Sequence, residues 1–246
     1  MSKPISLKIG NFLYRNLFPI YNILYPVFKR KQDADEINFL KNNIKKGDTI
    51  LDIGANIGFY AKILSDFVGN VGKVHSFEPD KINFQYLENN LRGRANVVLI
   101  NKAVSDNAGI IKVYKSKELN VDHRTYPVDD YEAVEEIEAT SIDQYINSAF
   151  KVEFIKLDIQ GYEISALKGM ENTIKSNPKI TMLLEFWPYG LHAAGHTVRE
   201  FCDLINSFGL KIFFLEKDNL LPFDYSKTEE YETRDWGQYK NLVVKL

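Results

Sequence analysis

Apolar residues occur along this chain in two arrangements, short continuous runs and stripes at three- and four-residue spacing. Continuous runs bounded by turn residues are typical of buried strands, and stripes at helical spacing are typical of amphipathic helices. Strands are predicted at residues 49–53, 75–78, 96–100, 151–159, 180–186, 211–216 and 241–246. Helices are predicted at residues 33–47, 59–68, 79–93, 161–174 and 197–209. This alternation predicts an α/β fold, a doubly wound parallel sheet with helices on both faces.

Several helix ends carry local signals. Asp33 with Glu36, and Thr197 with Glu200, have the spacing of a capping box at a helix N-terminus. Residues 79–93 begin with a proline and end with a glycine, which is the usual asymmetry of a helix. These signals set the predicted starts of three helices.

Residues 114–140 interrupt the alternation because they are polar and acidic. A run of like charges without apolar periodicity is typical of a solvated segment, and a solvent-exposed excursion is predicted here. Its acidic residues are Asp122, Asp129, Asp130, Glu132, Glu135, Glu136 and Glu138.

Residues 1–32 differ in another way, and we treat them as an N-terminal extension to a domain at 33–246. They contain six cations and no acid, with six aromatic residues interleaved. The longest uncharged stretch, 16–28, is too short to cross a bilayer, which takes about 20 residues. One interpretation is peripheral contact with the inner face of a membrane. The other, which we favour, is an aromatic flap packed over the domain.

Composition narrows the function. The 246 residues are 45% apolar and can bury one full core. The net charge of −2 provides no overall field that would attract nucleic acid. Cys202 is the only cysteine, so an intrachain disulfide is excluded and a helix core position in a reducing cytoplasm is predicted.

The turn after the first strand carries the candidate chemistry. It runs from Asp52 to Gly58 and contains two glycines, Gly54 and Gly58. Glu78 ends the next strand, twenty residues after Gly58. A carboxylate at that place accepts hydrogen bonds from ribose hydroxyls, which indicates an adenosine-containing cofactor. A dinucleotide motif would have its third glycine where Ala61 stands, and Asp52 would repel a pyrophosphate. The turn therefore favours S-adenosylmethionine, which carries an ammonium group and a positive sulfur.

Polar residues end the other predicted strands as well. In open α/β sheets, ligands bind beyond the carboxyl ends of the strands. The site is therefore predicted to gather Asp52, Glu78, Lys102, Asp158 and Glu185.

Four ordered motifs resemble those of the FkbM-type methyltransferases. They are residues 52–60, residues 77–79, residues 101–106 with Gly109, and residues 155–163. The resemblance covers roughly residues 36–216. It implies a seven-stranded sheet with an antiparallel last strand, S-adenosylmethionine as cofactor, and methylation of a hydroxyl on a sugar or another small molecule. The cofactor-binding residues that it implies are Asp52, Gly54, Ala55, Asn56, Gly58, Phe59, Tyr60, Glu78, Pro79, Ala103, Val104 and Asp158.

Two positions depart from that resemblance. The family usually has a glutamate where Gln160 stands, which would affect the handling of the acceptor more than cofactor binding. Many related enzymes have an acid before Ala103 to accept from the adenine amino group, and Lys102 cannot accept. Backbone groups around Ala103 and Val104 are expected to hold the adenine instead.

The candidate catalytic residues are Asp158, Glu185 and His192. Asp158 would orient the cofactor or the acceptor, or would form only a structural ion pair with Lys156. Glu185 or His192 would accept the proton of the hydroxyl, with His123 as a weaker candidate. Aromatic rings at 187 and 189 could stack on a sugar ring. No set of side chains has metal-ligand spacing, so no metal is predicted.

Other functions remain as alternatives. RNA ribose methylation is disfavoured because the fifth strand ends in Glu185 rather than in the lysine typical of those enzymes. A nicotinamide-dependent oxidoreductase is disfavoured by the spacing of the glycine turn. A cofactor-binding module without catalysis is the third alternative, and the oligomeric state is left open.

Overall fold

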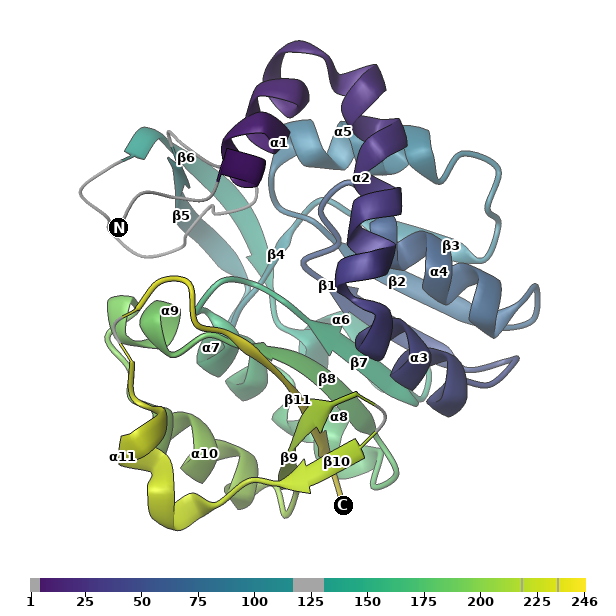
Figure 1. The fold of residues 1–246 in the computed structure, drawn as a ribbon. Helices are drawn as coiled ribbons and strands as arrows, with labels where there is room; N and C mark the ends of the chain where they lie inside the picture. The colour runs from purple at the N-terminus through teal and green to yellow at the C-terminus, as the bar shows by residue number, and fades with distance from the viewer. Residues whose placement is uncertain (1–4, 117–130, 218, 234) are drawn as a thin grey trace.

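A computed structural model describes residues 5–116, 131–217, 219–233 and 235–246 (Figure 1). Its main element is an eight-stranded sheet with the order β10-β9-β11-β8-β7-β1-β2-β3. The strands are β1 Thr49–Ile53, β2 Lys73–Phe77, β3 Val97–Ile100, β7 Phe154–Leu157, β8 Thr181–Phe186, β9 Lys211–Glu216, β10 Asn219–Pro222 and β11 Lys240–Lys245. β1, β2, β3, β7 and β8 pair in parallel, whereas β11 lies antiparallel between β8 and β9. The predicted doubly wound sheet with an antiparallel last strand is confirmed.

The sheet has one strand more than the seven predicted. β10 pairs antiparallel with β9 at the edge of the sheet. Lys217, in the turn between them, has a φ of +54°. A glycine would normally mark such a turn, and its absence hid the hairpin in the sequence.

The strands separate two layers of apolar side chains because successive residues of a strand point to opposite faces. Leu51, Ile155 and Met182 belong to the larger core cluster, which includes residues of α7 Glu163–Lys168 and α10 Val198–Ser207. Ile50 and Phe154 belong to the second cluster, with residues of α3 Ala34–Asn43 and α4 Phe59–Val68. Helices therefore cover both faces of the sheet.

Five further α-helices belong to the domain in the described residues, and apart from the ten-residue α5 they have six residues or fewer. They are α5 Lys81–Asn90, α6 Ile142–Ile146, α8 Glu171–Ser176, α9 Pro188–Ala193 and α11 Thr228–Tyr231. The helix predicted at 161–174 is thus divided into α7 and α8. A Cβ on Gly169, between them, would lie 2.0 Å from the carbonyl oxygen of Ser105, so the chain passes too close there for a larger residue.

One of the three predicted helix starts has the expected cap, and the other two differ from the prediction. α10 begins with the expected capping box of Thr197 and Glu200, and Cys202 is buried within it. α5 is capped by Asp80 instead of being opened by Pro79. The Asp33 side chain makes no capping hydrogen bond at α3 and instead contacts Lys29 and Tyr60.

The prediction of a solvated excursion at 114–140 was wrong for the residues that the structure describes. β5 Gly109–Ser116 and β6 Tyr131–Thr140 form an antiparallel pair, which β4 Ala103–Val104 joins in a second sheet. Ile137 and Ala139 are buried there with Val113, while Glu136 and Glu138, which alternate with them, are exposed. Acids alternating with apolar residues thus form a half-buried strand. Residues 117–130, with His123, Asp122, Asp129 and Asp130, lie outside the described residues.

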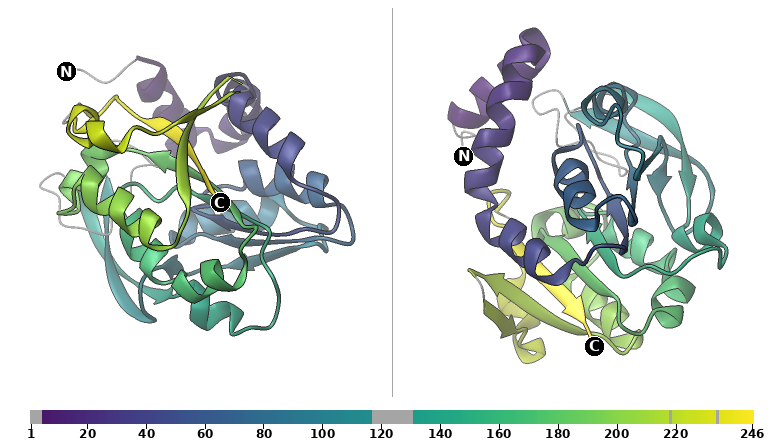
Figure 2. Two further views of the ribbon diagram at one scale, coloured as in Figure 1. Left: turned by 90° about the horizontal axis from the view of Figure 1, so that it is seen from below. Right: turned by 90° about the vertical axis from the view of Figure 1, so that its right-hand side faces the viewer.

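The N-terminal extension forms two helices, α1 Ile5–Asn16 and α2 Phe18–Gln32, along one side of the molecule (Figure 2, right). Pro19 lies in the first turn of α2, where its missing N–H disrupts no hydrogen bond. Tyr14 and Tyr21 are buried against Ile57, in the turn that follows β1. No helix within the described ranges is long and apolar enough to cross a membrane.

Candidate active site

A cavity of about 490 Å³ lies at the carboxyl ends of β1, β2, β7 and β8. Its volume lies within the roughly 300–1,000 Å³ that is typical of ligand sites. The residues at the strand ends that line it include Gly54, Ala55, Asn56, Phe59, Tyr60, Glu78, Pro79, Ala103, Val104, Asp158, Gln160 and Glu185. The sequence predicted all of these residues at the site except Gln160, whose role it left open.

The turn between β1 and α4 is fixed by close contacts with the neighbouring strands. The N–H groups of Gly54 and Ala55 both donate to the carbonyl of Phe77, at 3.0 and 2.9 Å. Gly54 has a φ of +87°, and a Cβ there would lie only 1.9 Å from the carbonyl oxygen of Asp158. Only glycine fits between these two strand ends. The turn thereby forms the floor of the cavity.

Glu78 follows β2 and is almost fully buried. Its two carboxylate oxygens accept the N–H of Asn56 at 2.8 Å and the N–H of Asp80 at 3.0 Å. Burial raises the pKa of Glu78 to about 7, although these hydrogen bonds oppose the shift. Each oxygen has a further lone pair, so the carboxylate can still accept from a ligand hydroxyl.

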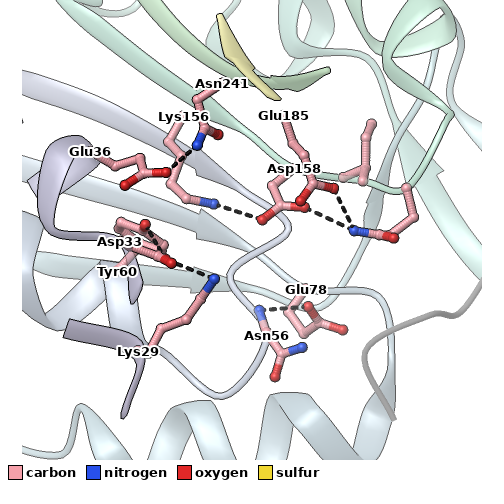
Figure 3. A network of polar contacts seen from close by, with 12 residues as sticks. Lys29, Asp33, Glu36, Asn56, Tyr60, Glu78, Lys156, Asp158, Glu185 and Asn241 are labelled. Atoms are coloured by element: carbon pink, nitrogen blue, oxygen red, sulfur yellow. Dashed lines mark hydrogen bonds and ion pairs between the residues drawn. The ribbon is translucent and has the colours of Figure 1, made fainter. Parts of the chain in front are cut away.

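Four side chains form a polar cluster beyond the ends of β7 and β8 (Figure 3). The ammonium group of Lys156 lies 3.3 Å from Oδ2 of Asp158. Nε2 of Gln160 donates to Oδ1 of Asp158 at 3.2 Å and to Oε2 of Glu185 at 2.8 Å. Gln160 therefore joins the two carboxyl groups by donating to both from one amide nitrogen.

The two carboxyl groups of this cluster differ in acidity. Burial acts to raise the pKa of Asp158, but Lys156, Lys29 and the Gln160 amide outweigh it and leave the pKa below its usual range. Burial, together with the charge of Asp158, raises the pKa of Glu185 well above its usual range. A pair with separated pKa values can hold one charge and one exchangeable proton.

Helix α2, from the segment interpreted as an aromatic flap, contributes a wall, although the sequence did not indicate which of its residues would line the cavity. Tyr25, Phe28, Lys29 and Gln32 line the cavity. The ammonium group of Lys29 pairs with Asp33 at 2.7 Å. Burial opposes the charge of Lys29, but the neighbouring Tyr25 and Asp33 raise its pKa above the usual value. A cation from the extension thus faces the carboxyl groups at the strand ends (Figure 3).

Asp33 connects this wall to the turn after β1. The Tyr60 hydroxyl donates to Oδ2 of Asp33 at 2.5 Å. The Lys156 ammonium lies 4.4 Å from the centre of the Tyr60 ring, where a cation is attracted to the π-face. Glu36, predicted to cap α3, instead accepts from the Asn241 amide. The extension is therefore connected to the site by polar groups.

A segment just before β11 closes the opposite side of the cavity. Trp236, Gly237 and Tyr239 line it, and the sequence offered no signal for them. The indole N–H of Trp187, which also lines the cavity, donates to the Trp236 carbonyl at 2.9 Å. The Gln32 amide donates to the Tyr239 hydroxyl at 2.9 Å, so α2 meets this segment at the cavity.

Three predicted site residues are not among the cavity-lining residues. Asp52 is fully buried, neither of its carboxylate oxygens has a hydrogen-bond partner among the described residues, and burial raises its pKa to about 6. Gly58 lies at the start of α4 with a φ of +92°. His192, on α9, pairs with Glu232.

Other predicted neighbours are placed as follows. Lys102 lines the cavity and pairs with Glu138 at 2.9 Å. Tyr189 packs against Trp187 and is not among the lining residues. Among the described residues, no group of His, Cys, Asp and Glu has the arrangement of a metal site.

Comparison with known proteins gives three findings. The family model for the methyltransferase FkbM domain matches residues 52–209. The hexuronic acid methyltransferase AglP of Haloferax volcanii is 26% identical over 177 residues, which cover 70% of this chain and 71% of that protein. A solved structure of a protein proposed to be an rRNA methylase from Clostridium thermocellum has a TM-score of 0.51, with 12% identity over 86% of this chain and 93% of that chain. The last likeness concerns the fold alone.

Proposed function

The chain belongs to the FkbM methyltransferase family, and from this membership we propose that it transfers a methyl group from S-adenosylmethionine to a hydroxyl of a sugar or glycan. Methyl transfer from S-adenosylmethionine follows from the family. The hydroxyl and the sugar are our own inference. It rests on the pair of carboxyl groups, Asp158 and Glu185, that Gln160 joins at an aromatic-walled cavity.

The residues at the cavity fit the cofactor of the family. Glu78 would accept from the ribose hydroxyls, and the glycine turn at 54–56 allows the backbone to approach the ligand closely. Backbone groups at Ala103 and Val104 would hold the adenine. The ionised Asp158 would pair with the ammonium group of the methionine part. When bound, S-adenosylmethionine supplies a methyl group on a positively charged sulfur.

We assign Glu185 as the general base. Its raised pKa makes it a better proton acceptor near neutral pH than Asp158, whose pKa is lowered. A positive charge brought into the cavity favours the ionised form of Glu185 and so lowers its pKa. When a hydroxyl of the acceptor receives the methyl group that the bound cofactor would supply, Glu185 would take the hydroxyl proton. Asp158 stays ionised and orients the reactants.

Aromatic rings on the far wall support a sugar as acceptor. Trp187, Trp236 and Tyr239 line the same cavity as the two carboxyl groups. Flat rings bury the apolar faces of a sugar, while carboxylates accept from its hydroxyls. A relative that acts on hexuronic acid agrees with this class of acceptor.

The same groups argue against the alternatives. A nucleic acid would bring phosphates toward Asp158 and Glu185, and the net charge of −2 offers no compensating field. The FkbM family and the polar residues at the strand ends argue against a module without catalysis.

The proposal is tested with methyl donor labelled in its methyl group. The protein is incubated separately with neutral oligosaccharides, uronic-acid oligosaccharides and RNA, and transfer is measured for each. We expect label only on saccharide, as a methyl ether by NMR. Label on RNA, on a carboxylate or on no acceptor, in a protein that binds S-adenosylhomocysteine by calorimetry, contradicts the proposal.

A further inference from the structure

Helix α2 is apolar on two opposite sides. The inner side carries aromatic residues, among them Phe18, Tyr21 and Tyr25, which pack on the domain. The outer side carries the exposed residues Leu17, Ile20, Ile23, Leu24, Val27 and Phe28. Ile23 is 71% exposed and Val27 is 69% exposed, although both would be buried by preference. A helix that is apolar all round needs a second apolar environment.

Helix α1 carries two further apolar residues, Ile9 and Phe12, that are more than half exposed. Eight of the seventeen large apolar side chains that are exposed in the described residues fall within positions 9–28. The two helices lie along one side of the molecule (Figure 2, right). We define the outer face as Ile9, Phe12, Leu17, Ile20, Ile23, Leu24, Val27 and Phe28.

The segment that carries the outer face, residues 1–32, contains six cations and no acid. Lys8, Arg15, Arg30 and Lys31 are exposed. The first acidic residue of the chain is Asp33, which is buried and holds Lys29 on the inner side. Apolar residues flanked by cations fit the boundary between the head groups and acyl chains of an anionic bilayer.

This charge pattern disfavours a second copy of the chain as the partner. A symmetric dimer through the outer face would bring the same surface of both copies together. Four exposed cations of each copy would then meet, with no acid in either extension to offset them.

We propose that α1 and α2 dock onto the surface of an anionic lipid bilayer through the outer face, without crossing it. Phe28 belongs to the outer face and also lines the cavity, together with Tyr25 and Lys29 of the same helix. Docking therefore holds the cavity next to the lipid surface. An acceptor carried on lipid would then reach the site. This consequence for the acceptor rests on the proposed function, whereas the docking itself does not.

Vesicle flotation at low salt tests the docking. Vesicles of phosphatidylcholine mixed with phosphatidylglycerol should carry the full-length protein upward, and vesicles of phosphatidylcholine alone should carry much less. The double variant Ile23→Asp/Val27→Asp should lower the partition coefficient by about tenfold or more, because two charges would enter the apolar boundary. The matched control Val71→Asp/Ile110→Asp places the same charges at exposed apolar sites outside the outer face and should float like the original protein.

A second variant tests the electrostatic contribution. Arg30→Gln/Lys31→Gln should lower partition by about 30-fold, since each cation near an anionic surface is worth roughly a factor of five. Added salt should weaken flotation of the original protein in the same direction, because it screens exposed charges.

The outer-face variants leave the inner side unchanged, so they should unfold at the same temperature and bind S-adenosylhomocysteine with the same affinity. These readouts separate a failure of docking from a failure of the proposed function. Absence of flotation on anionic vesicles overturns the docking. So does a dimer, detected by light scattering, that Ile23→Asp/Val27→Asp dissociates without changing flotation.

Discussion

Nε2 of Gln160 lies 2.8 Å from Oε2 of Glu185, and the same nitrogen donates to Asp158 at 3.2 Å. A neutral donor thus stands between two carboxyl groups. Gln160 has a φ of +57° and lines the cavity. Its amide has a structural role here, because a third carboxylate at this position would repel the other two.

Replacing Gln160 with a carboxylic acid should slow the reaction. Gln160→Glu removes a donor and adds a negative charge, which raises the pKa of Glu185 further and leaves it protonated over more of the pH range. We expect kcat at neutral pH to fall by about tenfold or more, and the pH dependence of kcat to move to higher pH. The exposed Gln144→Glu serves as control. An unchanged pH profile in Gln160→Glu would contradict this role.

Removing the Glu78 carboxylate should weaken cofactor binding. Glu78→Ala takes away the proposed acceptor for ribose hydroxyls and frees the N–H groups of Asn56 and Asp80. The loss of such hydrogen bonds costs about 1–3 kcal/mol, which is roughly 5- to 150-fold in the dissociation constant. Calorimetric titration with S-adenosylhomocysteine measures it, with the exposed Glu88→Ala as control. If Glu78→Ala and Glu88→Ala bind S-adenosylhomocysteine with equal affinity, Glu78 is not the acceptor for the ribose hydroxyls.

The parts of the site that the sequence predicted are those that local rules determine. Glycines 54 and 58 mark a turn, and the apolar run before them marks a buried strand. A parallel sheet then brings Glu78, Asp158 and Glu185 to one edge, whatever the rest of the chain does. Such residues can be found without knowing any tertiary contact.

The parts that were missed depend on tertiary packing. Lys29 reaches the cavity only because the aromatic residues of α2 pack on the domain, and no spacing connects residue 29 with residue 158. Trp236 and Tyr239 lie in an irregular segment that is placed by the pairing of β11. His192 is near the site in sequence, but its pairing with Glu232 could not be deduced from its position in the chain.

Two substitutions separate the candidates for the general base. Glu185→Gln removes the proton acceptor and should lower kcat by about 10²- to 10⁴-fold, the usual worth of general base catalysis. S-adenosylhomocysteine should still bind to this variant. His192→Ala should keep kcat within a few-fold of the original and leave its pH profile unaltered, since His192 is paired away from the cavity lining. The reverse pattern in steady-state kinetics would make His192 the base.

Glu163 should make the fold less stable as the pH rises from acid toward neutral. Its carboxylate is buried and accepts the N–H of Gly161 at 3.1 Å, and burial raises its pKa from 4.5 to about 7. Between these two values the folded state holds a proton that the unfolded chain has released, so the free energy of unfolding falls with pH in this window. A shift of this size corresponds to about 3 kcal/mol.

Glu163→Gln keeps an acceptor oxygen for the Gly161 N–H and cannot ionise. We therefore expect the variant to gain stability relative to the original protein between about pH 5 and about pH 8, measured by urea unfolding across that range. The measured quantity is how the difference in the free energy of unfolding between the variant and the original protein changes with pH. A packing cost of the amide that is the same at every pH does not affect it. The exposed Glu230→Gln should follow the original protein at every pH. A difference for Glu163→Gln that stays constant with pH would mean that the carboxyl group titrates near its ordinary value despite its burial.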